Sequence, residues 1–174
     1  SFPISAGFTN HLARNVDLSN FGADRIRQRS LSALDSTFQT TEAPQRVSDM
    51  DAGTVDAWLV HLAEGTAEDA PLEFDVLREV YLLRSETVII HGTALTEDQL
   101  GDVRDAKAKL VWSPQSNLRL YGETTLADKA LAMKLPLALG ADWLPSGSTS
   151  LLAEMKVARH WLAGRGKDIG AEAL

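Results

Sequence analysis

The chain has 174 residues, of which 44% are hydrophobic and 24% charged, a composition typical of one ordinary globular domain. Its net charge of -7 argues against a nucleic-acid or anionic-membrane partner. Because the chain has no cysteine, it can form neither disulfides nor thiolate metal sites, so a metal would need His, Asp or Glu ligands. No apolar run approaches the roughly 20 residues of a membrane span, and we expect a cytoplasmic protein.

The first third of the chain gives weak signals. Residues 1–21 show no sustained period and are interpreted as a loop. Residues 23–34 are ambiguous between helix and strand, and the polar residues 36–50 are expected to form a surface connection. We expect a single domain over residues 1–174.

From residue 55 onwards, apolar runs alternate with helical patterns. Four runs predict buried strands: residues 57–62, 87–92, 110–113 and 135–139. Apolar positions at helical spacing predict helices over residues 71–84, 97–108, 125–133 and 151–162. Thr96 and Gln99 suit a capping box, and Ser148, Thr149 or Ser150 can cap the last helix. Residues 114–117 are expected to form a loop.

Repeated strand–helix order indicates an α/β protein built from parallel βα units. A closed (β/α)8 TIM barrel needs about 250 residues, so this chain has room for little more than half of one. We therefore predict a partial (β/α)8 barrel.

Three predicted strand ends carry an ionisable side chain, namely His61, His91 and Asp142. Such ends meet on one face of a parallel sheet, and imidazole and carboxylate groups suit zinc or a similar divalent ion. Glu64, just past the first of these ends, could reach a water held there. Each histidine taken alone could be structural, and His11 and His160 have no such placement.

Four segments resemble successive strand ends of the amidohydrolase superfamily. They are His-Leu-Ala-Glu at 61–64, His-Gly-Thr-Ala-Leu at 91–95, Ser-Pro-Gln-Ser-Asn-Leu-Arg-Leu at 113–120 and Leu-Gly-Ala-Asp-Trp at 139–143. They are most similar to the branch of guanine deaminase, cytosine deaminase and chlorotriazine hydrolase. The resemblance covers about residues 55–163, in the same order, and implies the second half of the barrel.

What the resemblance implies is a metal-dependent hydrolase of C–N bonds in small molecules, with zinc as the metal and iron as an alternative. It makes His61 a metal ligand, Asp142 a ligand and base, and His91 a ligand or a group that polarises substrate and water. It makes Glu64 the proton shuttle. It also places Asn117 and Arg119 in the substrate pocket, where Trp143 would stack on a ring or fill the barrel mouth.

The chain departs from the family in one respect that bears on function. The family's first strand carries a His-x-His ligand pair, and this sequence has none. The expected small β-sandwich is missing too. The chain is therefore either a fragment of a longer hydrolase or a degenerate relative, and we favour a fragment, completed by the missing N-terminal segment or by self-association. Two alternatives stay open: a non-catalytic half-barrel scaffold, and a small doubly wound α/β binding domain with structural histidines.

Overall fold

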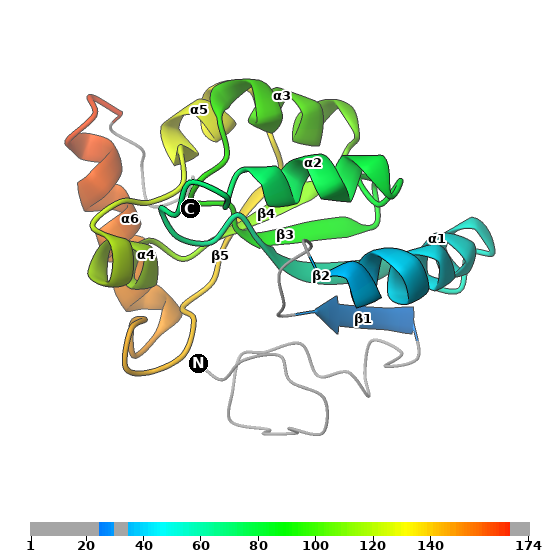
Figure 1. Ribbon diagram of the computed structural model, residues 1–174. Coiled ribbons are helices and arrows are strands. Elements are labelled where there is room, and N and C mark those ends of the chain that lie inside the picture. Colours follow the sequence, from blue (N-terminus) through cyan, green and yellow to red (C-terminus); the bar gives the residue numbers. More distant parts are fainter. Residues whose placement is uncertain (1–24, 30–34, 168–174) are drawn as a thin grey trace.

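The computed structural model describes residues 25–29 and 35–167, so the sequence-based expectations for residues 1–21 and for His11 lie outside the described part (Figure 1). The described residues form one parallel sheet of 5 strands, in the spatial order β1-β2-β3-β4-β5. The strands are β1 Ile26–Arg29, β2 Ala57–Leu62, β3 Thr87–His91, β4 Lys109–Trp112 and β5 Leu137–Leu139. The ambiguous segment 23–34 therefore contains a strand.

The helical segments between these strands are η2 Phe38–Glu42, α1 Ala43–Asp51, α2 Leu72–Glu79, α3 Glu97–Asp105, α4 Pro114–Tyr121 and α5 Ala127–Ala132, and α6 Leu151–Ala163 follows β5. Figure 1 shows α1, α2, α3 and α5 along one face of the sheet. A doubly wound domain needs helices on both faces and a reversal of strand order, and the described residues show neither. The doubly wound alternative is therefore wrong, and the predicted arc of a (β/α)8 barrel is confirmed. No helix in the described ranges is long and apolar enough to cross a membrane.

The core lies between the sheet and the helices that cover it. In β2, Trp58, Val60 and Leu62 are buried, whereas the alternating residues on the other face are partly exposed. Apolar side chains from the helices, such as Phe74 and Leu100, complete this core at 0% exposure. The opposite face corresponds to the inside of a barrel, and it is only partly covered by the residues described.

Two expectations about individual segments are wrong. The strand β5 is not buried on both faces, because Leu137 and Leu139 are partly exposed and Ala138 is exposed. The reason is that β5 lies at the edge of the described sheet, where it pairs with one strand, β4, and its other side is open. The expected loop at residues 114–117 is the first turn of α4, because Pro114 occupies a position near the helix N-terminus that proline suits.

The expected surface connection at residues 36–50 is also wrong. This segment forms η2 and α1, and Phe38, Ala43 and Met50 are buried. Phe38 stacks on Trp58 with ring centroids 6.1 Å apart and an interplanar angle of 10°. The apolar residues are too widely spaced among polar ones for their burial to be evident from the sequence.

The capping box predicted for α3 is present, and it allows a stability prediction. The Gln99 backbone N–H donates to Thr96 Oγ1 at 3.2 Å, and the Thr96 backbone N–H donates to Gln99 Oε1 at 3.0 Å. Thr96→Ala should lower the free energy of unfolding by about 1 kcal/mol, because one helix N–H loses its acceptor. Urea denaturation measures the change. Thr96→Ser retains the hydroxyl and should stay close to the wild type.

Candidate active site

The chain turns sharply at the carboxyl ends of three strands. Ala63 after β2, His91 at the end of β3 and Asp142 after β5 have φ values of 50°, 70° and 54°. Left-handed backbone costs about 1–3 kcal/mol in a residue with a side chain, so it persists where surrounding contacts impose it. At β3 the contact is a hydrogen bond of 2.5 Å from Thr125 Oγ1 to the carbonyl oxygen of His91.

The turn at His91 determines which way its ring points. His61 pairs with Ile90 in the register of β2 and β3, so a regular strand would direct His91 to the other face. Instead, the His61 and His91 ring centroids lie 5.3 Å apart with an interplanar angle of 46°. The left-handed backbone at His91 accounts for this convergence, which is required for both imidazoles to serve one site.

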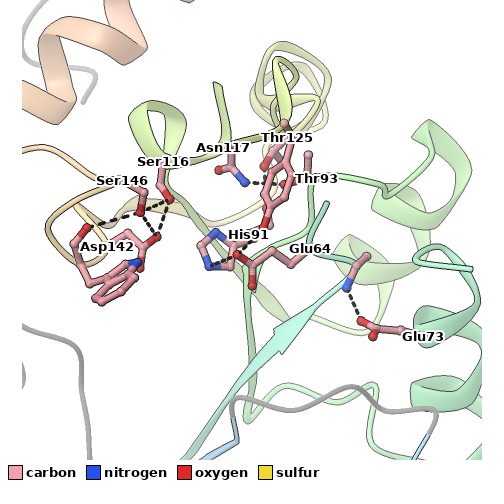
Figure 2. Close-up of polar contacts among 12 residues, drawn as sticks. Glu64, Glu73, His91, Thr93, Ser116, Asn117, Thr125, Asp142 and Ser146 are labelled. Carbon is pink, nitrogen blue, oxygen red and sulfur yellow. Dashed lines mark hydrogen bonds and ion pairs between the residues drawn. The ribbon is translucent and has the colours of Figure 1, made fainter. Parts of the chain in front are cut away.

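Glu64 lies beside His91. Its Oε1 lies 3.6 Å from Nε2 of His91, and it accepts a hydrogen bond of 3.0 Å from the Tyr121 hydroxyl (Figure 2). The residue before it is fixed as well, because the Ala63 backbone N–H donates to Glu73 Oε2 of α2 at 2.7 Å. The carboxylate of Glu64 is thus held by Tyr121 of α4, while α2 fixes the backbone of the residue before it.

Asp142 is held by two hydroxyl groups beside this cluster. Ser116 Oγ of α4 donates to Asp142 Oδ2 at 2.5 Å, and Ser146 Oγ lies 2.9 Å from Ser116 Oγ (Figure 2). Burial lowers the pKa of His91, while the negative charges of Glu64 and Asp142 act in the opposite direction. The structure therefore brings His61, Glu64 and His91 together, with Asp142 near enough for its charge to influence His91.

The three residues predicted to bind substrate lie in different surroundings. Asn117 is fully buried, and its Nδ2 donates to Thr93 Oγ1 beside the site. Arg119 is exposed and lies two positions further along α4, where a helix directs it to a different side. Trp143, next to Asp142, is 58% exposed. Substrate contact stays a prediction for all three residues.

The two imidazoles have the donor type that a zinc site uses. Imidazole nitrogens suit zinc, and Nδ1 of His91 is buried without a hydrogen-bond partner, as a ligand-binding atom would be. However, within residues 25–29 and 35–167 no three His, Cys, Asp or Glu side chains are grouped so that they could hold a metal ion. A complete metal site needs donors from outside the described residues.

Sequence analysis missed a buried carboxylate, Glu154 of α6. It is 0% exposed, and its Oε1 accepts a hydrogen bond of 2.8 Å from the Gln115 backbone N–H at the start of α4. Glu154 thereby anchors the helix that carries Ser116, Asn117 and Tyr121. The available signal was its place in the buried stripe with Ala158 and Leu162, at helical spacing.

Glu154 should make stability depend on pH. Burial raises its pKa, so the folded state holds this proton more tightly than the unfolded chain, where the pKa is ordinary. Its contribution to stability is complete below the unfolded pKa of 4.5 and is lost as the pH rises through the folded pKa. Glu154→Gln has no proton to lose, so its Tm relative to wild type should rise between about pH 4 and about pH 7.

Thermal unfolding across this pH range measures the effect of Glu154. Glu123→Gln, which alters an exposed carboxylate, is the control and should show no such trend. A constant difference between Glu154→Gln and the wild type would contradict the prediction.

The chain is similar in sequence or in fold to several known deaminases. No protein-family model matches the chain. A 5-methylthioadenosine/S-adenosylhomocysteine deaminase from Pyrococcus furiosus is 36% identical over 84 residues, which are 48% of this chain and 20% of the relative. An adenosine deaminase from Xanthomonas campestris, with bound zinc, gives a TM-score of 0.66 at 20% identity and covers 75% of this chain and 31% of its own. Escherichia coli guanine deaminase gives 0.61 at 23% identity, covering 73% and 31%.

These similarities confirm the resemblance to the amidohydrolase superfamily. The chain has the fold of part of an amidohydrolase barrel. It spans about 20% of the length of the curated relative and about 31% of the two solved structures. Because the ligands of one barrel site come from several strands, a chain of this share would hold only part of such a ligand set.

Proposed function

We propose that this chain is the second half of the barrel of a metal-dependent amidohydrolase that deaminates the adenine ring of a nucleoside such as 5-methylthioadenosine. The observation that carries the proposal is the convergence of His61, Glu64 and His91 at the ends of neighbouring strands. The sequence similarity to the Pyrococcus deaminase supports the substrate class. A cytoplasmic location is part of the same proposal.

Each side chain has a role in this reaction. A divalent metal, zinc in the first place and iron as the alternative, would supply an activated water, with His61 and Asp142 among its ligands. Water adds to the ring carbon that bears the amino group, and ammonia leaves as the carbonyl forms. Glu64 transfers a proton to the leaving nitrogen. His91, whose pKa burial lowers, stays beside the carbon and stabilises developing charge or shares the metal.

The test is an assay of the complete protein that contains this chain. It is loaded with zinc and given 5-methylthioadenosine, and ammonia release is measured. We expect turnover that a chelator abolishes and added zinc restores. Guanine, followed by ammonia release, and a chlorotriazine, followed by chloride release, serve as alternative substrates. Turnover of guanine alone would keep the reaction class but reject the substrate, whereas turnover of the chlorotriazine alone would break a C–Cl bond and would overturn the proposed function. No reaction with any of the three would overturn the proposed function.

A second candidate function is a non-catalytic scaffold. It is favoured by the incomplete donor set and by the two ends of the sheet, since β1 and β5 each have one neighbour among the described strands. Open edges of this kind invite pairing, either with the rest of a barrel or with a second copy of the chain. Size-exclusion chromatography with light scattering distinguishes these cases. A defined homodimer that shows no activity in the presence of zinc would favour the scaffold.

A further inference from the structure

Tyr121 is the side chain of this site to which neither the sequence nor the proposed reaction gives a role. It is the last residue of α4, and its hydroxyl donates to Glu64 Oε1 at 3.0 Å. The same oxygen lies 3.6 Å from Nε2 of His91. One oxygen of the candidate proton shuttle is therefore fixed between a phenol and an imidazole.

The ring of Tyr121 lies close to Gly65, the residue after Glu64. A Cβ built on Gly65 would lie 3.5 Å from Cε1 of Tyr121. Gly65 has φ +97°, so the loop turns beneath the ring at a position that favours glycine. The loop that carries Glu64 thus lies against Tyr121 at two points. Gly65 lies beside the ring, and the Glu64 carboxylate accepts the hydrogen bond from the hydroxyl.

The helix that carries Tyr121 is itself firmly attached. Glu154 of α6 accepts the Gln115 N–H at the N-terminal end of α4, and Ser116 binds Asp142. A group that orients another side chain needs such a rigid support, because its precision is no better than that of the element carrying it. By contrast, Glu64 has several rotatable bonds and a side chain 31% exposed, so it could turn towards solvent without a partner.

We propose that Tyr121 is a positioning residue for Glu64. Its hydroxyl holds Oε1 against His91, so that Oε2 is the oxygen that exchanges a proton with substrate. This inference rests on the proposed function. Burial, together with the charge and hydrogen bond of Glu64, raises the pKa of Tyr121 to about 12. The phenol is thus protonated throughout the neutral range and stays a donor.

The kinetic test uses the complete protein with zinc and 5-methylthioadenosine. Tyr121→Phe keeps the ring over Gly65 and removes the hydroxyl, so kcat should fall about 10-fold while KM changes little. In a Glu64→Gln background the same substitution should cause no further loss, since it acts through Glu64. Tyr81→Phe alters a tyrosine that is 74% exposed and is the matched control. An unchanged kcat, or losses that multiply in the double variant, would overturn the inference.

A second measurement does not depend on activity. The 174-residue chain has 2 tyrosines, so in this chain Tyr81→Phe leaves Tyr121 as the single site for fluorotyrosine, whose phenol is more acidic than that of tyrosine. When the titration of this phenol is followed by 19F NMR, the pH of its midpoint should exceed that of free fluorotyrosine. Glu64→Gln should lower the midpoint, whereas Glu68→Gln, an exposed carboxylate of the same loop, should not.

The two measurements separate the two proposals. If Glu64→Gln leaves the titration midpoint of the phenol unchanged, the phenol does not contact Glu64. The inference would then be wrong, whatever reaction the enzyme catalyses. The complete protein could instead deaminate none of the substrates while Glu64→Gln still shifts the titration midpoint of the phenol. In that case the contact between Tyr121 and Glu64 is confirmed, and the proposed function and the kinetic role of Tyr121 are both wrong.

Discussion

Glu64→Gln should lower kcat of the complete protein at least about 100-fold and leave its zinc content unchanged. The carboxylate lies 3.6 Å from Nε2 of His91, where it can pass a proton between water and the leaving nitrogen. Glutamine has nearly the same shape and still accepts the Tyr121 hydrogen bond, but it cannot carry a proton. Because Glu64 is not among the proposed metal ligands, the loss should appear in turnover and not in metal binding.

The matched control for this result is Glu68→Gln, which removes an exposed carboxylate from the loop between β2 and α2. It should leave kcat within about twofold, since surface substitutions have small effects. Zinc content is measured by atomic absorption on the same preparations. If Glu64→Gln turns over as fast as the wild type, Glu64 has no part in the mechanism. A parallel loss of zinc would instead make it a ligand.

The sequence predicts a site at these strand ends because the candidate residues follow readable strands. The runs before His61 and His91 are apolar and β-branched, and parallel strands bring their carboxyl ends to one face. The sequence could not predict the left-handed backbone at His91, because a strand pattern implies that neighbouring residues alternate between faces. The ring contact with His61 depends on this turn.

The supporting residues were harder to predict because their signals are not local. Tyr121 reaches Glu64 from a position 57 residues away in the chain, and Gln115 meets Glu154 across 39 residues. Such contacts follow from the packing of α4 against α6 and against the loop that carries Glu64, which no periodicity encodes. The burial of Phe38 in a polar segment is missed for the same reason, since Trp58 provides its stacking partner.

The isolated chain should bind zinc with an affinity about 1000-fold or more below that of the complete protein. Each missing ligand lowers affinity and leaves the remaining donors less well oriented. The sequence holds no His-x-His pair, and the described residues group no three donors around one point. His61 and His91, with ring centroids 5.3 Å apart, could retain a weakly bound ion between them.

Equilibrium dialysis with zinc measures this affinity directly, without any assay of activity. His61→Ala should abolish the residual binding, whereas His160→Ala, which removes an exposed imidazole of α6, should not change it. Adding the remaining half of the barrel as a separate chain should restore tight binding if the two halves assemble through the open edges of the sheet. Tight stoichiometric zinc in the isolated chain would contradict this account, because His61, His91 and Asp142 would then suffice for a site that their described arrangement does not form.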